Sequence, residues 1–205
     1  GQESAHPESV RPPPTEEPID SLIQQGLAYF SAHNYSKAIA CLTKVHPGSR
    51  QHGEALHLIG LCQKELGNFK NAIHFLNLST QIRPTDPQIW YHLAVVEAKI
   101  RQRKLAADHY RKVLELDPSR QDAWNNLGVL LKDLGQPSEA VRCYRAALKL
   151  AALPETFNNL TFPLLQIGKV GDALNACEEA IKLAPAFLRA HRSLLTAALY
   201  SSDLS

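Results

Sequence analysis

Two asparagine doublets have the residue type and the spacing to bind a ligand. Asn125-Asn126 and Asn158-Asn159 lie 33 residues apart. A carboxamide both donates and accepts hydrogen bonds, so a row of such groups could bond the backbone of an extended peptide. The alternative is that these side chains are only a solvated helix surface. The near-constant interval indicates a repeating frame that would bring the doublets onto one face.

The histidines and cysteines offer little further chemistry. His57 and His92 are the one histidine pair with plausible proximity, but two ligands without a third do not make a zinc site, so we expect no metal. No Cys-x-x-Cys pair occurs, and we expect the cysteines to be buried, reduced residues. No arrangement of Ser/His/Asp, paired carboxylates or phosphate-binding glycines is present, so the chain itself is predicted to be no enzyme and to need no cofactor. The cysteines are Cys41, Cys62, Cys143 and Cys177.

The charge and hydropathy of the chain argue against two classes of partner, nucleic acids and membranes. The net charge is +2, from 22 basic and 20 acidic side chains, and we expect no sustained basic face and no nucleic-acid partner. No stretch approaches the roughly 18 uninterrupted apolar residues of a membrane span, so we expect no membrane insertion. Reduced cysteines and the lack of a signal peptide favour a cytoplasmic location. The sequence begins at Gly1 and contains no methionine, which leaves open the alternative that a targeting signal has been removed.

Alanines set the frame that positions these side chains. Ala38, Ala72, Ala106, Ala140 and Ala173 follow one another at steps of 34, 34, 34 and 33 residues. Each unit has a large apolar fourth residue, a small eighth residue in most units, a turn at the fifteenth and often a proline at the thirty-second, which predicts two helices per unit. The fold class predicted is all-α, a right-handed α-solenoid of helix-turn-helix repeats.

This pattern resembles the tetratricopeptide-repeat family over Ile19 to Tyr200, with the best unit containing Trp124, Leu127, Gly128 and Tyr144. The resemblance implies that the first helices line the concave side, where positions two, five, six, nine and twelve face a ligand. We expect a protein or peptide partner in that groove. The residues singled out for partner binding are His57, Tyr91, His92, Asn125, Asn126, Val129, Asn158, Asn159, Phe162 and Arg192.

The predicted domain organisation follows the frame. Residues 1–18 are expected to be a disordered, proline-rich lead-in, and residues 188–200 a C-terminal capping helix followed by a tail, 201–205. Pro163 falls inside a predicted helix and should bend it at Phe162–Pro163, which either widens the groove or is a tolerated defect. The five repeats are predicted at 19–52, 53–86, 87–120, 121–153 and 154–187.

Two functions remain open from the residues. The first is a protein-interaction scaffold. The second follows from a resemblance of the asparagine doublets and of the ending Ala190 to Leu195 to the repeats of bacterial SPINDLY-type O-linked N-acetylglucosamine transferases. It implies that the chain is the substrate-recognition region of a larger glycosyltransferase or another repeat-bearing transferase. A chaperone C-terminal tail is not expected as partner, because Tyr91 with Val95, or His57 with Leu61, stand where tail-clamping repeats have Lys and Asn.

Overall fold

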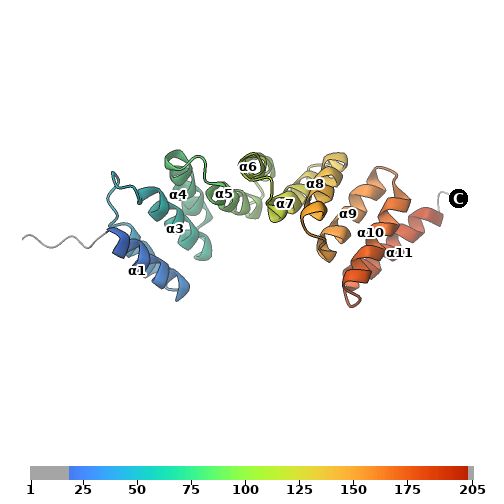
Figure 1. Cartoon of the computed structure of the whole chain (residues 1–205), viewed down its shortest axis with the longest axis horizontal. Helices are drawn as coiled ribbons and strands as arrows, with labels where there is room; N and C mark the ends of the chain where they lie inside the picture. Colours follow the sequence, from blue (N-terminus) through green and yellow to red (C-terminus); the bar gives the residue numbers. More distant parts are fainter. Residues whose placement is uncertain (1–18, 203–205) are drawn as a thin grey trace, which may run out of the picture.

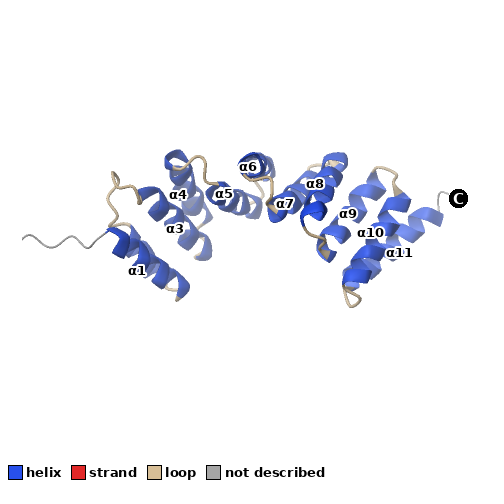
Figure 2. Ribbon diagram, in the orientation of Figure 1, coloured by secondary structure: helices blue, strands red, loops and turns tan. Residues whose placement is uncertain are grey.

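The protein is an elongated row of stacked helices. A computed structural model describes residues 19–202, and in that range it has eleven α-helices and no strand (Figure 1, Figure 2). The predicted lead-in, 1–18, and residues 203–205 of the predicted tail lie outside the described residues. The all-α solenoid predicted from the repeat pattern is confirmed, with α1 (Ile19–Ser31) and α11 (Leu188–Ser202) at opposite ends of the row.

The first ten helices form five consecutive antiparallel pairs, in which odd-numbered helices come first and even-numbered helices second, and α11 follows them with no second helix in the described residues. Helix α2 (Tyr35–Leu42) is the shortest of the described helices and ends ahead of the Pro47-Gly48 turn, and α11 runs to Ser202, two residues beyond the predicted capping helix. The elements are α1 (Ile19–Ser31), α2 (Tyr35–Leu42), α3 (His52–Glu65), α4 (Phe69–Ile82), α5 (Pro87–Lys99), α6 (Arg103–Leu116), α7 (Gln121–Asp133), α8 (Pro137–Leu150), α9 (Pro154–Gln166), α10 (Val170–Leu183) and α11 (Leu188–Ser202).

The turn inside each pair uses the same backbone conformation. The fifteenth residue of all five repeats has a positive φ, which permits the tight reversal from the first helix to the second. Three repeats place glycine there, and two place a side chain that pays a steric cost for this left-handed conformation. The five residues are His33, Gly67, Arg101, Gly135 and Gly168.

Small eighth residues let the two helices of a pair approach. A Cβ on Gly128 would lie 2.7 Å from a ring carbon of the fully buried Tyr144, and one on Gly60 would lie 2.8 Å from Leu76. In the fifth repeat Thr161 replaces the small residue, and its hydroxyl lies 3.3 Å from the Cys177 thiol, which is the smaller partner there. The eighth and twenty-fourth positions are therefore matched in size, repeat by repeat.

Successive repeats are joined by a second recurring contact. The indole nitrogen of Trp90 donates to the carbonyl oxygen of Pro84 at 2.8 Å, and that of Trp124 donates to Pro118 at 2.9 Å. The bond links the fourth residue of one repeat to the proline that ends the preceding second helix. Each of these first helices is thereby held at a defined distance from the repeat before it.

Helix α9 continues through Pro163, which is buried, up to Gln166. Proline removes one backbone hydrogen bond from the helix, and a bend relieves the accompanying clash. The bend expected at Phe162–Pro163 stays a prediction.

Candidate functional site

The polar residues of the first helices form a ladder from one repeat to the next. At each junction from α3 onward, the fifth residue of one first helix bonds the sixth residue of the following one. We call these four bonded pairs the first-helix ladder. The pairs are His57 with His92 at 2.7 Å, Tyr91 with Asn126 at 3.3 Å, Asn125 with Asn159 at 3.3 Å, and Asn158 with Ser193 at 2.9 Å.

At the junction of α1 and α3, the corresponding positions hold apolar residues instead. Ile23 and Leu58 occupy the corresponding fifth and sixth positions, and both are buried in one apolar cluster. The ladder positions thus serve first to hold neighbouring repeats together, whether through apolar contact or hydrogen bonds.

Burial keeps the His57–His92 pair of the first-helix ladder neutral. The Nε2 atom of His57 lies 2.7 Å from the Nδ1 atom of His92, so one imidazole donates and the other accepts. Desolvation lowers the pKa of His57 to about 4. Desolvation and then the proximity of His57 lower the pKa of His92 to about 4. Both rings are therefore uncharged at neutral pH.

Arg120 contacts the Tyr91 ring, which belongs to the next pair of the ladder. The Arg120 guanidinium lies over the Tyr91 ring, 4.4 Å from its centroid, and donates to Gln88 at 2.8 Å. Its Nε and second Nη also donate to the two carboxylate oxygens of Asp122, at 3.0 and 2.9 Å. This planar, bidentate arrangement fixes the guanidinium and leaves it little freedom to bind another anion. Arg120 thus stabilises the junction of α5 and α7.

The asparagines predicted to capture a peptide already have partners in the chain. Asn126 donates to the hydroxyls of Tyr91 and Tyr110, each at 3.3 Å. The Oδ1 atom of Asn125 accepts from Thr156 and Asn159, also at 3.3 Å each. These bonds use part of the capacity of each amide, so the ladder is in the first place a contact between repeats.

Near the C-terminal end of the ladder, the first-helix face contains a hollow of about 260 Å³. Phe162 in this hollow is 50% exposed, which is high for a large apolar side chain on a helix face that packs against its neighbours. Lys132 is the one charged residue that lines it. We call this the Phe162 hollow; its lining residues are Lys132, Asn158, Asn159, Thr161, Phe162, Leu165, Ser193 and Thr196.

The structure brings together only some of the residues predicted to bind a partner. Asn158, Asn159 and Phe162 share the hollow, whereas Val129 is half-buried on α7 and Arg192 is exposed on α11 outside the hollow's lining. His57, Tyr91 and His92 lie in the earlier rungs. Lys132 and Leu165 were not singled out by sequence reasoning, although both occupy the twelfth position of the predicted face.

Residues 19–202 contain neither a metal-binding cluster nor a membrane-spanning helix. No group of three or more His, Cys, Asp or Glu side chains there is arranged to hold a metal ion. No helix in that range is long and apolar enough to cross a bilayer. The four cysteines are free and buried, as predicted, and burial raises the pKa of the Cys62 and Cys143 thiols to about 11. At neutral pH these two thiols are protonated and poorly nucleophilic.

Paired helices in register, joined junction by junction, define the chain as an α-solenoid repeat protein. Residues 122–151 match the tetratricopeptide-repeat model, and residues 31–113 match the model of anaphase-promoting complex, cyclosome, subunit 3. Each model covers less than half of the chain, and together with the fold these matches support its resemblance to the tetratricopeptide-repeat family.

Solved structures share this fold at low sequence identity. YrrB, described as a tetratricopeptide-repeat protein with an unusual peptide-binding site, superposes with a TM-score of 0.77 and 19% identity, over 87% of this chain and 93% of that one. MamA superposes with a TM-score of 0.73 and 18% identity, over 80% and 90% of the two chains. These likenesses establish the architecture alone.

Two curated relatives are much longer proteins. FlbA of Caulobacter vibrioides is 25% identical over 163 residues, which are 78% of this chain and 27% of FlbA. The BBSome complex member BBS4 of Bos taurus is 24% identical over 163 residues, 78% of this chain and 31% of BBS4. The chain therefore spans less than a third of either relative. The narrower resemblance to SPINDLY-type transferases receives no support from these similarities.

Proposed function

We propose that the chain is a protein-interaction module that binds an extended peptide segment of a partner protein on the first-helix face, at the Phe162 hollow. The observation that supports this most directly is the half-exposed Phe162 ring, set beside Leu165 and the amides of Asn158 and Asn159. An apolar surface bordered by hydrogen-bonding groups can take a peptide side chain and hold the adjoining backbone.

The ladder limits how much of this face can bind. Asn158 accepts from Ser193 through its Oδ1 atom, which leaves its NH₂ group to donate to a peptide carbonyl. Asn159 donates to Asn125, so its Oδ1 atom is the group that can accept from a peptide N–H. One donor and one acceptor on adjacent residues suit a single extended residue of the ligand.

The solved relative YrrB is described as having a peptide-binding site, and BBS4 as a member of a complex. Both descriptions agree with an interaction role for this chain. The alternative function, the substrate-recognition region of a larger glycosyltransferase, receives no support from the relatives.

The test uses one exposed side chain that is outside the ladder. Peptides selected on the intact chain from a random display library would be measured by fluorescence anisotropy against Phe162→Ser and against Leu150→Ser. Leu150 is a matched control, because it is 46% exposed and lies at the end of second helix α8. We expect Phe162→Ser to weaken binding about tenfold or more, as for a central anchor residue, and Leu150→Ser to change it little.

Two results would contradict the proposal. One is a set of selected peptides that bind Phe162→Ser as tightly as the unaltered chain, and the other is a library from which no peptide is enriched. Circular dichroism spectra of both variants confirm that the helices persist.

A further inference from the structure

The second helices of the third and fourth repeats, α6 and α8, each carry an excess of basic residues. Helix α6 carries four Lys or Arg residues against two Asp or Glu, and α8 carries three against one. Helix α10, the next second helix, carries three acidic residues against one basic. With a net charge of only +2 over the whole sequence, this surface holds an excess that the total conceals.

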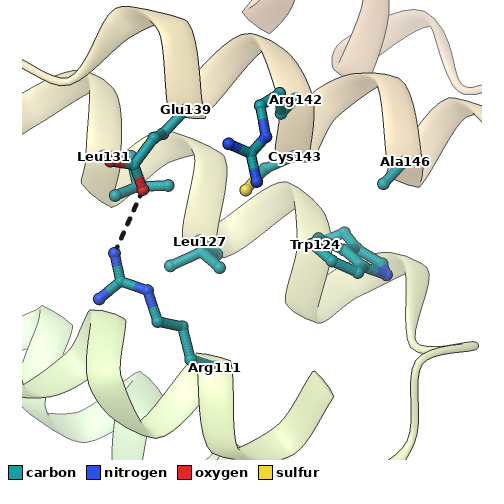
Figure 3. Close-up of a pocket in the computed structure, with 8 residues that line it drawn as sticks. All are labelled: Arg111, Trp124, Leu127, Leu131, Glu139, Arg142, Cys143 and Ala146. Atoms are coloured by element: carbon teal, nitrogen blue, oxygen red, sulfur yellow. Dashed lines mark ion pairs between the residues drawn. The ribbon is translucent and has the colours of Figure 1, made fainter. Parts of the chain in front are cut away.

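A second hollow opens on this basic surface, away from the first-helix ladder. Its volume is about 280 Å³, and residues of α6, α7 and α8 line it (Figure 3). The Trp124 ring is fixed there by its bond to the carbonyl of Pro118. We call this hollow the outer groove; its lining residues are Arg111, Trp124, Leu127, Leu131, Glu139, Arg142, Cys143 and Ala146.

The two arginines of the outer groove differ in their ion pairs with acidic side chains. Arg111 pairs with Asp108 at 2.8 Å and, across the groove, with Glu139 at 3.5 Å (Figure 3). Arg142 is exposed and makes no ion pair with any described residue. An anion entering the groove would therefore meet one uncompensated guanidinium beside an apolar floor.

We propose that the outer groove binds an acidic segment of a partner protein, with one large aliphatic or aromatic side chain of that segment placed on Trp124 and Leu127. A carboxylate of the segment pairs with Arg142 in this arrangement. The groove has room for a large side chain, and the excess of basic residues on α6 and α8 attracts the flanking acidic ones.

The composition of the groove favours a peptide over a nucleic acid. Phosphate backbones are bound by closely spaced cations without intervening acids, because affinity grows with each neutralised phosphate. Here Glu139 lies at the groove and Asp108 beside it, paired with Arg111, and the half-buried Trp124 ring lies next to the buried Leu127 and Leu131. A peptide can alternate acidic and apolar residues to match this pattern.

The next junction supplies a control from within the chain. Arg145 and Asp172 repeat the Arg111–Glu139 pair one repeat later, with an N–O distance of 2.8 Å. At that junction Asn175 stands at the position of Arg142, and Glu179 at the position of Ala146. Because the chain already folds with these residues at those positions, Arg142→Asn with Ala146→Glu removes the charge match without a foreign side chain.

The experiment measures fluorescence anisotropy of a short labelled peptide made of Asp, Glu and Ser around a central Leu. We expect the intact chain to bind it, and the Arg142→Asn/Ala146→Glu variant to bind it roughly tenfold more weakly or worse, since a charge-assisted bond is lost and an acid is added. Lys182→Asn removes a basic side chain from α10 and should leave binding unchanged. A peptide with Ser in place of the Leu should bind more weakly to the intact chain.

The proposal is overturned if the double variant binds the peptide as well as the intact chain does, or if the Leu makes no difference. It is also overturned if the intact chain ignores the acidic peptide and binds a labelled single-stranded oligonucleotide in a way that depends on Arg142, which would assign the surface to nucleic acid. Binding at low and at physiological salt separates the apolar contribution from the electrostatic one.

Discussion

The paired imidazoles of His57 and His92 should make the stability of the fold depend on pH. Both pKa values are lowered from 6.5 to about 4, with burial as the leading cause. In the unfolded chain these histidines take up protons below about pH 6.5, while in the folded chain they resist until about pH 4. The stabilisation is therefore complete above pH 6.5 and is lost progressively as the pH falls toward 4.

The magnitude follows from proton linkage. One histidine with these two pKa values lowers the free energy of unfolding of the protein by about 2 kcal/mol between neutral pH and about pH 5. One protonated ring can still donate to its neutral neighbour, whereas two protonated rings lose the hydrogen bond and repel each other. Protonation of the pair should therefore lower the free energy of unfolding by between about 2 and 4 kcal/mol. The lower value is favoured because His92 is only partly buried.

The assay is urea unfolding, followed by circular dichroism at several pH values between about 7.5 and 5. The control is the double variant His57→Ile/His92→Leu, which copies the apolar pair of Ile23 and Leu58 at the preceding junction. Other groups facing the pair, Asp86, Arg83, Lys64 and Arg120, remain in both proteins and drop out of the comparison. If the two proteins lose stability in parallel as the pH falls, the reasoning about this rung is refuted.

Two further substitution pairs test local packing and backbone strain. Among the described residues, the buried Tyr144 hydroxyl has no hydrogen-bond partner, while the Tyr110 hydroxyl, at the equivalent position, accepts from Asn126. Tyr144→Phe should therefore be neutral or stabilising, and Tyr110→Phe should lower the free energy of unfolding by about 1 kcal/mol in urea unfolding. The opposite outcome would contradict the hydrogen-bond assignment. Arg101 and Gly135 have φ values of 66° and 74° at the same turn, so Arg101→Gly should raise the unfolding free energy by about 0.5–1 kcal/mol and Gly135→Ala should lower it by about 1 kcal/mol. Changes of the same sign in both would show that the positive φ is not the deciding factor.

Much of the fold could be predicted because its determinants are local. Glycine at the eighth position and a large residue at the twenty-fourth indicate a close helix pair, and Gly67, Gly135 and Gly168 mark the tight turn. His33 and Arg101 take the same backbone conformation without the glycine that would have signalled it. There the tertiary contacts of the two helices outweigh the preference of a single residue.

The candidate site was predicted only in part. The repeat frame correctly brought His57 close to His92 and placed Asn158, Asn159 and Phe162 together. It did not indicate that the asparagines bond one another across repeats, because a carboxamide bonds a neighbour or a ligand equally well. The outer groove was missed, since its residues come from three helices and the total charge of the chain hides its basic character.

The periodic spacing of apolar and small residues by itself determined that this protein is a solenoid of helix pairs, because helix formation, turn geometry and pairing depend on residues close in sequence. Only the tertiary structure decided which polar groups bond one another within the solenoid and which stay accessible on its surface. That choice depends on distances of about 3 Å between side chains some 35 residues apart, such as Asn158 and Ser193, and on the hollows left open beside them.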